Sequence, residues 1–215
     1  MCAPYPAQAV GDPKALKKER SVARWRGLGD SPMLAALIVG LSLCGARAVE
    51  AATYTFVKDY TSVRFSWSHL GLSRQSARVM DFDGTVEFEP DQPEASRVDV
   101  LMKASSLRTG VQAFDDLLKS VEYFDAQRNP TIRFRSTSAR RMSDRTGELT
   151  GDLTVMGITK PVTLYVVWNF TGAHPLAQVN PNYKDVFVAG FSATGVLRRS
   201  DWGLSRAVPL VSDEI

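Results

Sequence analysis

The two histidines, His69 and His174, are the residues of this 215-residue chain best suited to acid–base or metal chemistry. A histidine metal site would need both, but they lie far apart in the chain and lack the helical spacing of a zinc motif. A Ser/His/Asp triad could be built on His69, yet no G-x-S-x-G elbow, P-loop or H-E-x-x-H motif occurs. The residues around His69 are instead typical of a strand end, where the ring hydrogen-bonds a loop. We therefore predict no metal, no catalytic residue and no enzymatic activity.

Arginine side chains could bind an anionic group. Arg133 and Arg135 fall on one face of a predicted strand, opposite Ile132 and Phe134. A solvated outer face is the simpler interpretation, and a rim that meets an anionic head group is the alternative. Near the C-terminus, the run Arg198–Asp201 predicts an ion-paired strand end.

Charge and cysteine are unevenly distributed along the chain. Residues 1–48 hold seven of the 26 basic and three of the 23 acidic residues, which leaves 19 basic and 20 acidic residues after them. The body of the protein is therefore not basic, which argues against charge-driven binding of nucleic acid. Both cysteines, Cys2 and Cys44, also lie in this first part, so the body cannot use thiolate or disulfide chemistry.

The first 48 residues are predicted to be a leader that ends in a secretory signal peptide. Residues 1–32 are rich in Pro, Gly and charge and show no apolar periodicity. Residues 33–44 form an apolar run too short to span a bilayer, and Ala46-Arg47-Ala48 matches a small-x-small cleavage site. A buried core helix is the alternative for this run. We expect an exported domain at residues 49–215, located in the periplasm and not integral to the membrane.

The elements that must position any site are predominantly strands. Apolar residues alternate in two arms within residues 147–168, at Leu149, Leu153 and Val155 and then at Val162, Leu164, Val166 and Trp168. Period-two alternation predicts strands with one face buried, here a hairpin. We place Gly157 in its turn and Pro161 at the first position of the second strand, where a missing N–H does least harm.

Further strands are predicted at residues 54–58, 63–68, 98–102, 132–135 and 187–193. Residues 79–89 hold either a hairpin turn at Asp83-Gly84 or a strand that runs straight through it. One short helix is expected at residues 111–119, with a capping box between Thr109 and Gln112. About eight strands at hairpin spacing favour an all-β fold closed into an antiparallel barrel, which can hold one small ligand. By pattern alone, a packed interior is more common than a cavity.

Seven segments together resemble the YceI-like family, and they run in order from about residue 53 to residue 204, nearly the whole exported chain. They are FSWSHLG at 65–71, FDGTVEF at 82–88, SSLRTG at 105–110, YFD at 123–125, PTIRFRS at 130–136, GDLTVMGITKPVTL at 151–164 and RSDWGL at 199–204. The resemblance implies an extended, lipocalin-like eight-stranded barrel in the bacterial periplasm. It also implies an apolar tunnel that binds a polyisoprenoid, either a polyprenyl diphosphate or an isoprenoid quinone. Members of the family often form dimers, so a homodimer is one assembly open to this chain.

These implications give a set of candidate ligand-binding residues. We expect the tunnel wall at Phe65, Trp67, Phe88, Phe134, Leu153, Val155, Leu164, Val166, Trp168 and Phe191, and the mouth at His69 and Arg133. The hypothesis is a non-enzymatic carrier. The alternatives are a structural or interaction barrel of the cell envelope without lipid, and an enzyme that acts on a lipid or quinone through His69 or an Asp.

Two positions depart from the family pattern. Tyr60-Thr61 stands where the family usually has His-Ser, and Phe114-Asp115 where it usually has Arg-Asp. The missing arginine removes a guanidinium that could hold a diphosphate, which shifts the expectation toward a neutral head such as a quinone.

Overall fold

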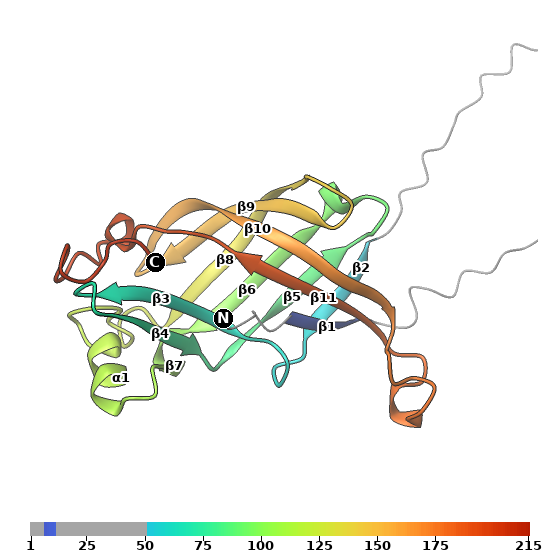
Figure 1. Ribbon diagram of the computed structural model, residues 1–215, viewed down its shortest axis with the longest axis horizontal. Helices are drawn as coiled ribbons and strands as arrows, with labels where there is room; N and C mark the ends of the chain where they lie inside the picture. Colours follow the sequence, from blue (N-terminus) through green and yellow to red (C-terminus); the bar gives the residue numbers. More distant parts are fainter. Residues whose placement is uncertain (1–6, 12–50) are drawn as a thin grey trace, which may run out of the picture.

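A computed structural model describes residues 7–11 and 51–215 of the chain and confirms the all-β fold (Figure 1). Eight antiparallel strands close into one barrel. Around the barrel they are β1 (Ala7–Gly11), β11 (Phe187–Thr194), β10 (Ile158–Ala173), β9 (Thr146–Val155), β8 (Thr131–Arg141), β6 (Arg97–Lys103), β5 (Phe82–Phe88) and β2 (Ala52–Phe56). The predicted signal peptide lies outside the described residues, so the leader and the boundary at residue 48 stay predictions.

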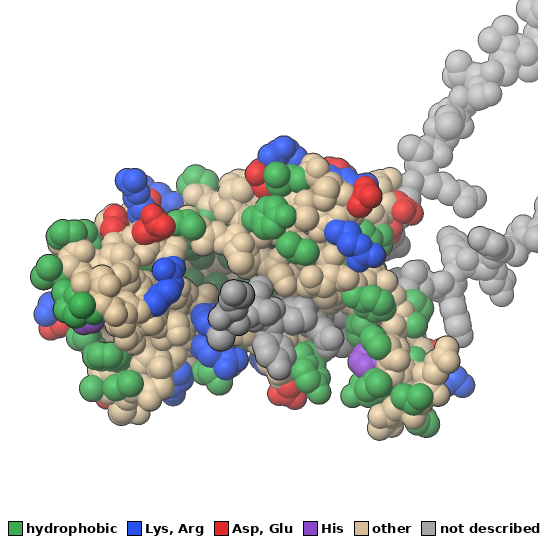
Figure 2. Space-filling view, viewed as in Figure 1, with side chains coloured by type: hydrophobic (Ala, Val, Ile, Leu, Met, Phe, Trp, Pro, Cys, Tyr) green, Lys and Arg blue, Asp and Glu red, His purple; other side chains and the backbone are tan. Residues whose placement is uncertain are grey.

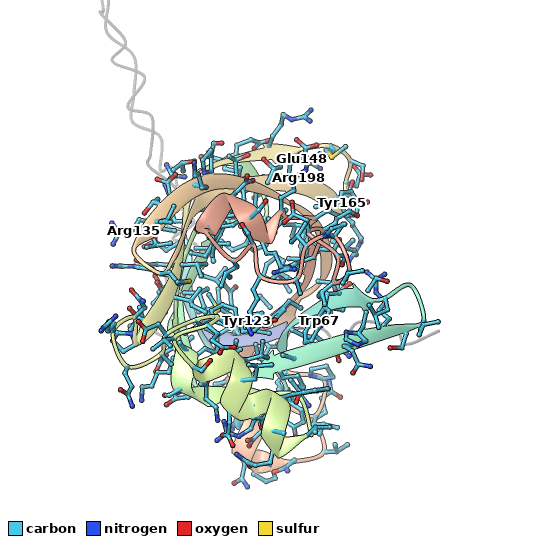
Figure 3. All side chains as sticks on the ribbon, turned by 90° about the vertical axis from the view of Figure 1, so that its left-hand side faces the viewer. Trp67, Tyr123, Arg135, Glu148, Tyr165 and Arg198 are labelled. Atoms are coloured by element: carbon cyan, nitrogen blue, oxygen red, sulfur yellow. The ribbon has the colours of Figure 1, made fainter. Side chains whose placement is uncertain are left out.

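A second, three-stranded sheet lies beside one end of the barrel. It consists of β3 (Val63–His69), β4 (Ser73–Val79) and β7 (Leu107–Arg108), and helix α1 (Gln112–Lys119) lies next to it (Figure 1). Viewed from that end, the barrel wall forms a ring with α1 and this sheet across its lower side (Figure 3). Short 3₁₀ turns at Pro93–Ala95, Ala104–Ser106, Pro181–Tyr183 and Arg199–Trp202 complete the described elements.

The β9–β10 hairpin forms as predicted. Its two turn residues, Met156 and Gly157, both have positive φ, at 50° and 74°, as a two-residue hairpin turn requires. Pro161 lies inside β10 opposite Asp152, not at the strand's first position. Its missing N–H is tolerated there because β11 pairs with β10 only from Tyr165 onward, so Pro161 is at a free edge.

The sequence prediction was wrong for three strands. β3 was expected in the barrel but belongs to the second sheet, and β1, from a segment with no predicted element, takes the barrel position between β2 and β11. The five residues of β1 carry no apolar alternation, so only their backbone pairing identifies them as a strand. β4 was missed because its sequence, SRQSARV, buries only Ala77 and Val79.

The structure also answers two local questions, namely whether the chain turns at Asp83-Gly84 and how helix α1 is capped. β5 runs straight through Asp83-Gly84, and Gly84 is needed there because a Cβ would collide with the backbone oxygen of Asp99 on β6. Helix α1 lies within the predicted range, but its N-cap residue is Val111 and no side-chain cap forms. The predicted capping box is wrong because the Thr109 hydroxyl donates instead to the Asp115 carboxylate, at 2.7 Å.

Candidate functional site: the cavity inside the barrel

The barrel is hollow. A cavity of about 690 Å³ runs through it, so the interior is not the packed core that pattern alone favours. Its wall consists mainly of inward-facing residues that alternate with outward polar ones along each strand. These residues include Val100, Met102, Ile132, Phe134, Leu149, Leu153, Val155, Val162, Leu164 and Val166.

Three aromatic rings lie together at one end of the cavity, which we call the aromatic end. The ring centroid of Phe88 lies 5.2 Å from that of Trp168 and 4.9 Å from that of Phe191, both edge-on. The Trp168 indole donates a hydrogen bond to the Thr171 hydroxyl at 2.7 Å. The Arg145 guanidinium lies 5.4 Å from the Trp168 ring centre and donates to the Asn169 carbonyl. This end is therefore lined by aromatic rings, and the Arg145 guanidinium lies over one of them.

The other end is covered by residues that follow β11. Trp202 is buried, and its indole N–H donates to the Leu153 carbonyl on β9 at 3.1 Å. Leu204 lies beside it in the cavity wall, and Phe124, which follows α1, packs there against Phe65 with 6.0 Å between the ring centroids. The loop after β11 is thus fastened across the barrel opening.

Arg199 holds this loop together through hydrogen bonds of its buried side chain. Its guanidinium is buried and donates to the carbonyls of Leu204, Arg206, Val211 and Ser212. The predicted ion-paired strand end is wrong for this residue, because its hydrogen-bond partners are backbone carbonyls. A guanidinium has five donors in a fixed fork, which suits it to collecting several carbonyls from one loop.

Nine of the twelve predicted ligand-binding residues line the cavity. They are Phe65, Phe88, Phe134, Leu153, Val155, Leu164, Val166, Trp168 and Phe191. Phe65 does so although β3 lies outside the barrel. Neighbouring Trp67 packs on Phe65, with ring centroids 5.7 Å apart, and is not in the cavity wall.

The predicted mouth is corrected. Arg133 is on the outer surface of the barrel, where its guanidinium binds the Asp99 carboxylate at 2.9 and 2.6 Å. Arg135 joins the same carboxylate at 3.2 Å and projects outward (Figure 3). These guanidiniums, Arg133 first, hold the pKa of Asp99 below its usual range. Arg133 faces outward because Ile132 and Phe134 occupy the inner face of the same strand.

His69 is also away from the cavity. It ends β3, as expected, and forms a bridge with Val211 of the C-terminal segment. His174, the other histidine, stacks on Tyr183 with ring centroids 3.9 Å apart in the loop after β10. Within the described residues, no three His, Cys, Asp or Glu side chains cluster as metal ligands would.

Several lining residues were not among the predicted ones. Val100, Met102 and Ile132 could have been found, since they alternate on strands that the sequence predicts. Arg64, Ser66 and Arg74 had no such signal, because polar residues on β3 and β4 read as a solvated face.

Comparison with known proteins agrees with the fold. The family model described as YceI-like domain matches residues 54–215. A UPF0312 protein of Pseudomonas savastanoi pv. phaseolicola is 34% identical over 178 residues, which is 82% of this chain and 88% of that protein. The YCEI protein of Campylobacter jejuni superposes with a TM-score of 0.60 at 27% identity, over 74% of this chain and 90% of that one. BcnA of Burkholderia cenocepacia gives a TM-score of 0.61 at 20% identity, covering 71% and 89% of the two chains.

No helix in the described part of the chain is both long and apolar enough to cross a membrane.

Proposed function

This chain belongs to the YceI-like family, and on that premise we propose that it is a periplasmic carrier that holds the prenyl chain of an isoprenoid lipid inside its barrel. The observation that carries the proposal is the cavity of about 690 Å³ with its apolar wall. Its volume lies in the range of about 300–1,000 Å³ typical of ligand pockets.

Energetics favour an apolar occupant. At roughly 24 cal/mol per Å³, leaving a cavity of 690 Å³ empty would cost about 17 kcal/mol. A whole domain is stable by only about 5–15 kcal/mol, so the space must hold water or a ligand. A prenyl chain that replaces water along this wall gains about 25 cal/mol for each Å² of apolar surface buried. Binding therefore needs no charged contact along the chain.

The chemistry of the wall supports a carrier over an enzyme. Neither of the two histidines lines the cavity, and the inward-facing residues of the barrel strands that do are mostly aliphatic or aromatic. An enzyme that uses His69 would need that ring beside the ligand, whereas it lies at the end of β3 against Val211.

Phe114, which stands where the family usually has an arginine, does not indicate which head group the bound lipid carries. Phe114 is an exposed residue of α1 and is not part of the cavity wall. An arginine at this place would start from the outer surface, so its absence gives no reason to prefer a quinone. Both a polyprenyl diphosphate and an isoprenoid quinone remain within the proposal.

Mass spectrometry of lipid extracted from the purified native protein tests the carrier function. We expect an isoprenoid lipid near one molecule per barrel. Leu164→Trp should lower this occupancy severalfold, because the larger ring fills the cavity. Tyr165→Trp is the matched control, since Tyr165 is the next residue of β10, is exposed and lies outside the cavity wall. Absence of any prenyl lipid from the unmodified protein would count against the function.

Export and assembly belong to the same proposal. Cell fractionation should find the protein in the periplasm. Cleavage after residue 48 would also remove β1 from its place between β2 and β11, so N-terminal sequencing of the periplasmic protein tests the cleavage site separately. Sedimentation should show a homodimer.

A further inference from the structure

Within the described residues, the cavity also opens sideways, between β3 and β11. Beyond Phe191, the described residues give β11 no strand partner on the side away from β10. β3 pairs with β4 on one side, and on the other only its last residues meet the C-terminal segment 210–215, as in Ser212 N–H to Ser68 O at 3.0 Å. We call this opening the side window. Residues 192–196, 62–66 and 214–215 border it, and all of them line the cavity.

Two arginines line the cavity here, Arg64 of β3 at the side window and Arg74 of the neighbouring strand β4, and Ser66 lies between them. Arg74 Nε donates to the Ser66 hydroxyl at 3.2 Å, and neither guanidinium is within 4 Å of a carboxylate in the described part of the chain. Basic side chains lie on this face of the molecule beside β3 (Figure 2).

The row of charges across the small sheet is unfavourable for folding. Arg64 lies directly opposite Arg78, and Arg78 directly opposite Arg108. Like charges in opposed positions of an antiparallel pair are destabilising. Only Arg108 has an acidic partner here, Asp115, at 3.8 Å. An anion at the window would relieve this repulsion.

We propose that the side window binds the phosphate or diphosphate head of the prenyl lipid, through Arg64 and Arg74, while the prenyl chain fills the barrel. The inference rests on the proposed function and deepens it, since it selects an anionic head over a neutral one. The Arg74–Ser66 pair adds a hydroxyl donor. The edges of β3 and β11 that have no strand partner among the described residues add backbone N–H donors, which suit phosphate oxygens.

The aromatic end is a poorer place for the head. Its cations are already engaged, because Arg145 donates to Asn169 and faces Trp168, Arg140 pairs with Glu148 at 2.7 Å, and Arg141 pairs with Asp144 at 3.3 Å. The window also has acids at its border, namely Glu214 and the terminal carboxylate of Ile215. The Arg64 and Arg74 guanidiniums form no ion pair with these acids, so they stay available to a ligand.

Three lipids with one C20 chain separate the head from the chain: geranylgeranyl diphosphate, geranylgeranyl monophosphate and geranylgeraniol. Affinity would be measured on the delipidated full-length protein at about 0.15 M salt, where the Debye length is about 8 Å, through tryptophan fluorescence. We expect the diphosphate to bind at least about tenfold more tightly than the alcohol, the usual scale of a charge-assisted contact. Arg64→Ala and Arg74→Ala should each remove about tenfold of this preference, without changing the affinity for geranylgeraniol.

Arg135→Ala is the matched control, because it removes the same charge from the outer face of the barrel, at a residue outside the cavity wall. It should leave the preference within about twofold, since separated charges are screened. Equal affinity for diphosphate and alcohol in the unmodified protein, or an unchanged preference in both arginine variants, would overturn the window site while leaving the carrier function intact. If inorganic pyrophosphate alone bound as tightly as the prenyl diphosphate, the site would be one for free anions and the proposal would fail. If none of the three lipids bound, the carrier function itself would fail.

Discussion

The ring of Phe134 occupies the place that a side chain at Gly151 would need. A Cβ built on Gly151 would lie 2.6 Å from Phe134 Cζ and 2.5 Å from the Arg135 backbone oxygen. The two residues belong to adjacent strands, β8 and β9, where Gly151 pairs with Ser136 and Phe134 pairs with Leu153. The glycine therefore lets the aromatic ring lie flat along the cavity wall.

Gly151→Ala should destabilise the protein by about 1–3 kcal/mol, because overpacking forces the ring and the strand apart. Urea denaturation measures the change. Asp152→Ala, at the next and exposed residue, should change stability by less than about 0.5 kcal/mol. Adding Phe134→Leu to Gly151→Ala should recover part of the loss, since the shorter side chain makes room. Purely additive effects in this cycle would show that the contact is not the cause.

The same strands show what the sequence could predict. Alternation identified β9, β10 and the barrel class because their inner residues are apolar and their outer residues polar. It failed for β4, where two of the four residues on the inner face, Ser73 and Gln75, are polar, and for β1, whose backbone pairing leaves no mark on side-chain type. The alternation pattern also led to β3 being placed in the barrel. A strand with one apolar face has the same pattern in either sheet, so the pattern does not show which sheet the strand joins.

For the site, the apolar wall was predictable and the polar border was not. Phe134 and Leu164 line the cavity because inward alternation is a local property of a strand. Arg133 was assigned to the mouth although it is on the opposite face from Phe134, where Asp99 neutralises it. Arg64 and Arg74 reach the cavity only because β3 and β11 leave an opening, and such an opening depends on tertiary arrangement.

Arg199→Met should loosen the C-terminal segment. The substitution leaves the carbonyls of Leu204, Arg206, Val211 and Ser212 without their shared donor, and burying unpaired polar groups costs about 1–3 kcal/mol each before water enters. We expect faster hydrogen exchange at the amides of Leu197 and Ile215, which pair with each other's carbonyls at 2.9 and 2.8 Å.

Arg198→Met is the control for this exchange experiment, because Arg198 is the exposed neighbour. Equal protection of the segment in both variants would mean that Arg199 does not hold it.

Asp115→Asn should reduce stability in a pH-dependent way. Asp115 is buried, and the backbone N–H and the hydroxyl of Thr109 hold its pKa below its usual value. A lowered folded-state pKa stabilises the protein above the unfolded-state pKa of about 3.9. This contribution is lost as the pH falls through the still lower folded-state pKa. The stability gap between the unmodified protein and the variant should therefore be widest above about pH 5 and narrow on acidification.

Asp116→Asn changes an exposed carboxylate on the same helix and should show a much smaller gap in the same titration. A gap for Asp115→Asn that stays constant down to pH 2 would mean that the ionised carboxylate contributes nothing.

Arg133→Ala should leave lipid affinity unchanged. Its guanidinium is outside the barrel and bound to Asp99, so its removal affects only a half-exposed ion pair worth less than about 1 kcal/mol. Affinity for geranylgeraniol and for its diphosphate should both stay within about twofold, the scale on which distant surface charges act. A selective loss of affinity for the diphosphate would indicate that the head group binds at Arg133, on the outer face of the barrel.

Phe88→Ala should change the length of chain that the barrel prefers. Phe88 is the centre of the aromatic end, with its ring edge-on to both Trp168 and Phe191, and it is buried. Removing it lengthens the cavity at the end opposite the C-terminal loop. Relative affinity for a C40 over a C20 prenyl alcohol should therefore rise, although stability should fall by about 3–5 kcal/mol.

Phe82→Ala separates these two effects. Phe82 is on the same strand, is equally buried and packs edge-on against Phe56 at 5.8 Å, but it does not line the cavity. Its loss should reduce stability by a comparable amount and leave the preference between C40 and C20 alcohols as it was. A matching shift in both variants would mean that looser packing, and not the position of the aromatic end, sets the length of the bound chain.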